Sequence, residues 1–110
     1  MHITMVKKIR ADGSPCRKCA DVERRLQADG YTDRVDRVVI ADERDPDSEG
    51  MRLAREHNVE AAPFFIVEDG GAVRVYTVYL RLVREVLKGE TDAAEEAAEL
   101  LERNRDLDFL

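Results

Sequence analysis

The first forty residues switch from a strand pattern to a helical pattern and back, which limits the folds open to this chain. Apolar and β-branched residues fill 2–10 and 34–41, whereas residues 16–28 repeat apolar side chains at helical spacing. Two strands joined through a helix pair in parallel, because such a crossover returns the chain to the same end of the sheet. We therefore expect an α/β fold that opens with a strand–helix–strand unit.

The later segments extend this pattern. Asp69-Gly70-Gly71 separates two short strand-like runs and predicts a hairpin, since glycine supplies the positive φ of tight turns. The expected order is βαβαββα, a four-stranded mixed sheet with flanking helices, plus an additional C-terminal helix. The remaining expected elements are a helix at about 47–58, strands at 63–68 and 72–77, and a helix at about 78–88 that Gly89 ends. We expect a packing or capping role for His57 and core positions for Phe64 and Phe65. We expect Tyr76 and Tyr79 to pack in the core, with a place at the edge of the functional site as the alternative.

Charge divides the chain into two parts. Residues 1–88 carry 16 basic and 16 acidic side chains, so residues 89–110, with eight acidic and two basic ones, supply the net charge of −6. We expect a domain over 1–88 and an acidic helical extension over 89–110 that packs on it, with a dimer contact as the alternative role of the helix and a monomer as the favoured state. The expected apolar face of that helix contains Ala94, Ala97, Ala98 and Leu101, and Phe109 and Leu110 are expected to dock or fray.

Several classes of protein are disfavoured by composition and patterning. No apolar run reaches the roughly 18 residues of a membrane span. The first residues are interrupted by Lys7, Lys8 and Arg10 and lack the apolar core of a signal peptide. The arginines are scattered among acids, with no basic stripe for nucleic acid. We therefore expect a cytoplasmic protein with neither membrane nor nucleic-acid partners.

Both cysteines of the chain lie in one short motif, Ser14-Pro15-Cys16-Arg17-Lys18-Cys19. Cys16 would begin the first helix, where exposed backbone N–H groups and nearby cations stabilise a thiolate and lower the pKa of the thiol. Cys19 lies one turn later on the apolar face. We therefore expect an exposed nucleophile, Cys16, and a shielded resolving thiol, Cys19.

Other uses of the cysteine pair stay open. A disulfide clip across so short a loop would add little stability. A closed zinc site needs four ligands, and His2 and His57 are not in zinc-finger spacing, so a metal or iron–sulfur site would have to be shared between two chains or completed by glutathione. The third alternative is a non-catalytic interaction domain. We predict no metal within a single chain.

The Cys16–Cys19 motif, together with the Ala62-Pro63 step that opens the third strand, resembles the thioredoxin/glutaredoxin superfamily. The resemblance covers about residues 2–88 and implies a thioredoxin-like fold and a thiol–disulfide oxidoreductase. It further implies that the bond before Pro63 is cis, that Cys16 is the nucleophile and Cys19 the resolving thiol. The substrate-binding positions that it implies are Pro15, Arg17, Lys18, Ala62 and Pro63.

The resemblance also implies partners and the absence of a resident cofactor. The partners would be disulfide-containing proteins as substrates, with a reductase or a low-molecular-weight thiol as electron donor. The only redox group would be the disulfide that Cys16 and Cys19 can form. Against a glutathione site, Ala61-Ala62 replaces the Thr-Val that glutaredoxins place before the proline. The chain also carries Arg10 where thioredoxins have a buried acid, and Pro15 where they have tryptophan.

Overall fold

A computed structural model of the 110-residue chain describes residues 1–105 and 110, the side chains of 103–105 excepted. The described part is an α/β structure that combines a four-stranded mixed sheet with four α-helices. The elements are β1 (His2–Ile9), α1 (Arg17–Ala28), a 3-10 turn (Thr32–Arg34), β2 (Arg37–Asp42), α2 (Glu49–Glu56), β3 (Phe64–Asp69), β4 (Ala72–Tyr76), α3 (Tyr79–Leu82), a π-helical turn (Val83–Leu87) and α4 (Ala93–Arg105).

The sheet has the strand order β2-β1-β3-β4. β1 and β2 are parallel, as the strand–helix–strand opening predicted, with Val6 opposite Val39. β3 is antiparallel to both β1 and β4, with Phe65 facing Met5 on one side and Tyr76 on the other. This confirms the predicted mixed sheet and its hairpin, in which Gly70 and Gly71 both have positive φ.

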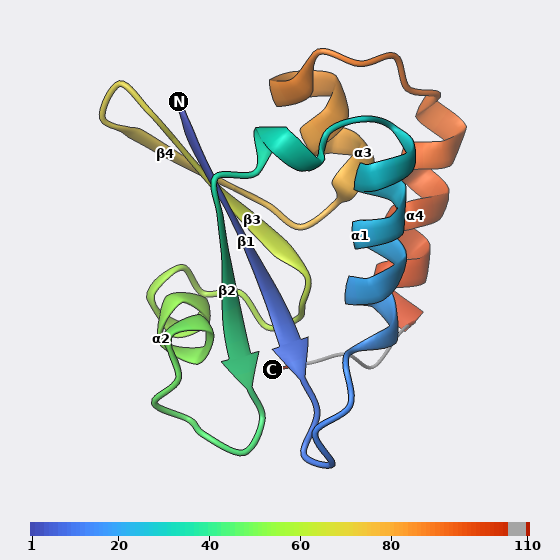
Figure 1. The fold of residues 1–110 in the computed structure, drawn as a ribbon. Coiled ribbons are helices and arrows are strands. Elements are labelled where there is room, and N and C mark those ends of the chain that lie inside the picture. The colour runs from blue at the N-terminus through green and yellow to red at the C-terminus, as the bar shows by residue number, and fades with distance from the viewer. Residues whose placement is uncertain (106–109) are drawn as a thin grey trace.

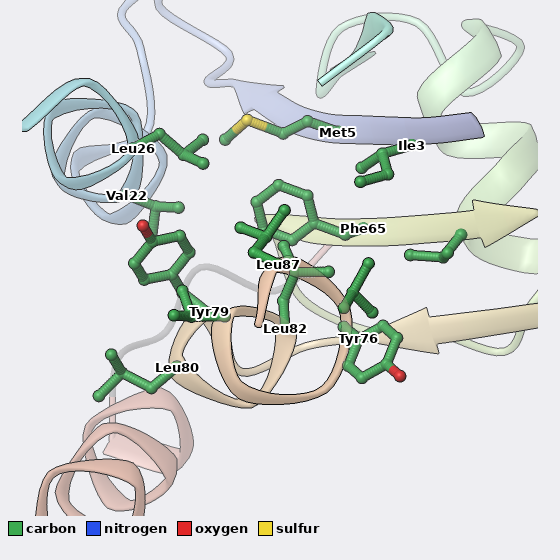
Figure 2. Close-up of a cluster of buried hydrophobic side chains, with 13 residues drawn as sticks. Ile3, Met5, Val22, Leu26, Phe65, Tyr76, Tyr79, Leu80, Leu82 and Leu87 are labelled. Carbon is green, nitrogen blue, oxygen red and sulfur yellow. The ribbon is translucent and has the colours of Figure 1, made fainter. Parts of the chain in front are cut away.

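Helices cover both faces of the sheet (Figure 1). α2 lies on one face, over a cluster that includes Val6, Ala54 and Phe64. α1 and α3 lie on the other face with the larger cluster, where Met5 and Phe65 point from the strands toward the helices (Figure 2). The sheet is therefore packed by a separate apolar layer on each face, because successive side chains of a strand point to opposite faces.

Most element boundaries lie close to those predicted from the sequence, and two elements differ. The second strand begins at Arg37 instead of residue 34, because 32–34 forms a 3-10 turn. The predicted helix at 78–88 is confirmed, but it widens into a π turn after Leu82. Gly89 does not supply the left-handed residue at its end: Lys88 does, at φ 63°.

α4 docks through its acidic side, and the expected orientation of this helix is wrong. Ala94, Ala97, Ala98 and Leu101 are exposed, whereas Glu96 and Glu99 are partly buried. Glu99 accepts hydrogen bonds from the backbone N–H groups of Tyr79 and, at 2.9 Å, Leu80. The start of α3 has no side-chain cap of its own, so a carboxylate from α4 satisfies amides that an apolar face would leave unpaired.

Among the described residues, no helix is both long and apolar enough to cross a membrane.

Candidate functional site

The two cysteines lie where β1 passes into α1. A short bridge between Ile9 and Pro15 closes the intervening loop, and Gly13 turns the chain there with φ of 86°. The N–H of Cys16 then donates to the carbonyl of Lys8 at 3.2 Å. Cys16 is consequently the N-cap residue of α1, and the predicted helix start is confirmed.

Each sulfur accepts a backbone hydrogen bond. The N–H of Cys19 donates to Sγ of Cys16 at 3.3 Å, and the N–H of Lys8 donates to Sγ of Cys19 at 3.3 Å. Both side chains are reduced thiols. A backbone donor favours the thiolate over the thiol, because the charged sulfur is the stronger acceptor. The loop geometry thus provides each sulfur with a group that can stabilise negative charge.

The loop before β3 completes the site. Ala62 is buried in one cluster with Cys16 and Cys19, although more than forty residues separate it from them in the chain. The Ala62–Pro63 bond is cis, as the resemblance implies, and Pro63 is buried. The structure therefore brings Ala62, one of the predicted substrate-binding positions, together with both predicted catalytic residues.

Cys16 is fully buried, so the expectation of an exposed nucleophile is wrong for this state. Its exposed fraction is 0%, and that of Cys19 is 1%, which confirms only the shielding expected of Cys19. Leu110 packs against the cluster formed by Cys16, Cys19 and Ala62. No local sequence pattern places Leu110 at this cluster, because more than ninety residues separate it from both cysteines. The neighbouring Phe109 lies outside the described residues.

The two cations of the motif, Arg17 and Lys18, lie at the side of α1 that faces α4. Pro15 and Arg17 are exposed, and Lys18 is buried with Nζ 3.9 Å from a carboxylate oxygen of Glu102 in α4. Arg17 and Lys18 line a cleft of about 510 Å³ between α1 and α4, whose acidic wall includes Glu95, Glu99 and Glu102. The two predicted substrate-binding cations therefore face the C-terminal helix in this state.

Lys8 is a residue of the site that sequence reasoning missed. Its backbone donates to Cys19 and accepts from Cys16, and its side chain is buried with Nζ 3.8 Å from Glu43. The available signal was a lysine near the end of an apolar strand. That signal did not reveal which groups the strand end would contact, because backbone hydrogen bonds carry no side-chain signature.

Within residues 1–105 and 110, no three His, Cys, Asp or Glu side chains gather where they could hold a metal ion. In comparisons with known proteins, no family model, no curated protein and no solved structure matches this chain.

Proposed function

We propose that this protein is a thiol–disulfide oxidoreductase with a thioredoxin-like fold. The observation that carries the proposal is the cluster that Cys16 and Cys19, at the start of α1, form with Ala62. Both sulfurs in it accept hydrogen bonds from backbone N–H groups. The order of the elements and the mixed sheet are compatible with that fold. The proposed substrates are proteins or small molecules that contain a disulfide.

The reaction would take place in two exchanges. The Cys16 thiolate attacks one sulfur of the substrate disulfide; that bond breaks, a mixed disulfide forms and the other substrate sulfur leaves as a thiolate. Cys19, after losing its proton, attacks the sulfur of Cys16 and releases the second substrate thiol. Two electrons pass to the substrate and leave a Cys16–Cys19 disulfide. A dithiol, a low-molecular-weight thiol or a reductase then restores the two thiols.

The hydrogen bonds of the site suit these roles. The backbone N–H of Cys19 donates a hydrogen bond to the sulfur of Cys16, the proposed first nucleophile. The position of Cys16 at the N-terminus of α1 adds positive partial charge beside the same sulfur. The backbone N–H of Lys8 donates a hydrogen bond to the sulfur of Cys19, which is the nucleophile of the second exchange. Both stabilising donors belong to the backbone, so side-chain substitutions nearby would leave them in place.

Single cysteine variants test the proposal. Reduction of a disulfide-linked peptide by dithiothreitol is followed with catalytic amounts of wild type, Cys16→Ser and Cys19→Ser. We expect loss of turnover in Cys16→Ser, and a covalent mixed disulfide with the peptide in Cys19→Ser, detected by mass spectrometry. Full turnover by Cys16→Ser would overturn the proposal. Metal analysis of purified wild type identifies the alternative, since iron or zinc bound at a stoichiometric level would indicate a metal module.

A further inference from the structure

Leu110 makes two kinds of contact with the proposed active site. Its backbone N–H donates to the carbonyl of Glu60 at 2.6 Å, just before the Ala62-Pro63 step. Its side chain packs against the cluster of Cys16, Cys19 and Ala62 and also against the core beneath α2. Figure 1 shows this end of the chain beside the carboxyl end of β1. A backbone hydrogen bond and an apolar contact together hold Leu110 against the cluster that contains both thiols.

This placement is particular to Leu110 and does not extend to the other leucines of the C-terminal extension. Leu100 and Leu101 in α4 are 42% and 60% exposed, although the same apolar driving force acts on them. Leu110, by contrast, is half-buried. The site therefore offers Leu110 a position that the outer surface of α4 does not offer to equivalent side chains.

The helix that precedes Leu110 is attached mainly by polar contacts. Glu99 caps the amides of Tyr79 and Leu80, and Arg84 binds Glu96 with Nε 2.8 Å from the carboxylate. The longer contact of Lys18 with Glu102 joins α4 to the cysteine motif itself. Surface ion pairs of this kind exchange for water at low cost, so they oppose separation of the extension only weakly.

We propose that Leu110 is a built-in plug that keeps the cysteine pair covered until a substrate displaces it. This inference rests on the proposed function. In the covered state, Cys16 is inaccessible to a disulfide as large as a protein. When Leu110 leaves, the apolar position beside Ala62 and the carbonyl of Glu60 become available to an extended substrate segment. The C-terminal extension would thus limit reaction to substrates that compete for the same position.

Reactivity of the thiols in the full-length chain tests the plug directly. The rate of Cys16 alkylation by N-ethylmaleimide is measured in reduced wild type, Leu110→Asp and Leu110→Ala, with each site assigned by mass spectrometry. Leu101→Asp is the matched control, because it introduces the same change into the same extension at an exposed leucine. We expect Cys16 to react at least about tenfold faster in Leu110→Asp, to a smaller degree in Leu110→Ala, and within about twofold of wild type in Leu101→Asp.

Equal Cys16 rates in wild type and both Leu110 variants would overturn the plug. Equal acceleration in Leu101→Asp would also overturn it, by showing a general loosening of the extension. Circular dichroism and the thermal midpoint establish that the variants are folded; if Leu110→Asp is not, Leu110→Ala decides. The reductase assay separates the two proposals. Faster alkylation without any peptide reduction keeps the plug and rejects the oxidoreductase, whereas turnover with unchanged alkylation does the reverse.

Discussion

The hydroxyl of Tyr79 donates to a carboxylate oxygen of Asp29 at 2.9 Å, which joins the start of α3 to the end of α1. Tyr79 is buried beside the side chains of α1 (Figure 2), and Asp29 is the C-cap residue of that helix. Burial, and then the hydrogen bond to Asp29, raise the pKa of Tyr79 above its ordinary value. One bond thus connects the two helices that cover the larger core and does so across fifty residues of sequence.

Replacing Tyr79 with phenylalanine should destabilise the protein by about 1–2 kcal/mol, because the hydrogen bond from the buried hydroxyl to the Asp29 carboxylate is lost while the ring is kept. Urea unfolding at pH 7 measures this change. Tyr76→Phe is the control, since that hydroxyl donates to Glu85 over a longer distance, 3.1 Å, and its loss should cost less. Because the pKa of Tyr79 is raised in the folded state, its contribution to stability is present at pH values below the ordinary pKa of tyrosine. This contribution is lost as the pH rises through the folded-state pKa of Tyr79. A larger loss in Tyr76→Phe would contradict this assignment.

Gly50→Ala should destabilise the protein by about 1–3 kcal/mol, although alanine favours a helix by about 1 kcal/mol over glycine. A Cβ at position 50 would lie 2.3 Å from the backbone N of Ala41 and 2.5 Å from the carbonyl carbon of Ile40. α2 would have to move away from β2. Thermal unfolding compares this variant with Arg52→Ala, an exposed change in the same helix that should stay within about 0.5 kcal/mol of wild type. A stabilised Gly50→Ala would show that the two elements are not in close contact.

The attachment of α4 should weaken in acid. The Arg84 guanidinium, and then the Thr91 hydroxyl, hold the pKa of Glu96 below its ordinary value. A lowered folded-state pKa contributes stability above the unfolded-state value, about 4.3, and this contribution is lost as the pH falls through the folded value. Wild type should therefore be more stable than Glu96→Gln at pH 7, and the difference should vanish near pH 3.

Urea unfolding at the two pH values measures that difference. Asp42, whose pKa Arg44 lowers, contributes acid sensitivity to both proteins, so it cancels in the comparison. A difference between wild type and Glu96→Gln that stays constant with pH would contradict the ion pair as its cause. High salt at pH 7 should shrink the same difference, since the pair lies at the surface.

The order of the elements could be predicted from local patterns alone. The alternation of apolar residues in 2–10, the helical spacing from Cys16 to Leu26 and the Asp69-Gly70-Gly71 turn each depend on neighbours in the sequence. Cys16 as the first residue of a helix follows from the same local chemistry. The helix ends just before Gly89 as predicted, but the role of this glycine differs: Lys88 supplies the positive φ, and Gly89 avoids a clash with Tyr31, a contact between distant segments.

The sequence by itself determined the βαβαββα order, the start of α1 at the cysteines and the acidic character of the extension, because these depend on side-chain periodicity and composition. Only the tertiary structure decided which side of α4 faces the domain and whether Cys16 is exposed. The amides at the start of α3 donate to Glu99, which turns the acidic side of α4 toward the domain, and Leu110 packs against the cluster of Cys16, Cys19 and Ala62. Both outcomes depend on long-range contacts that no local pattern encodes.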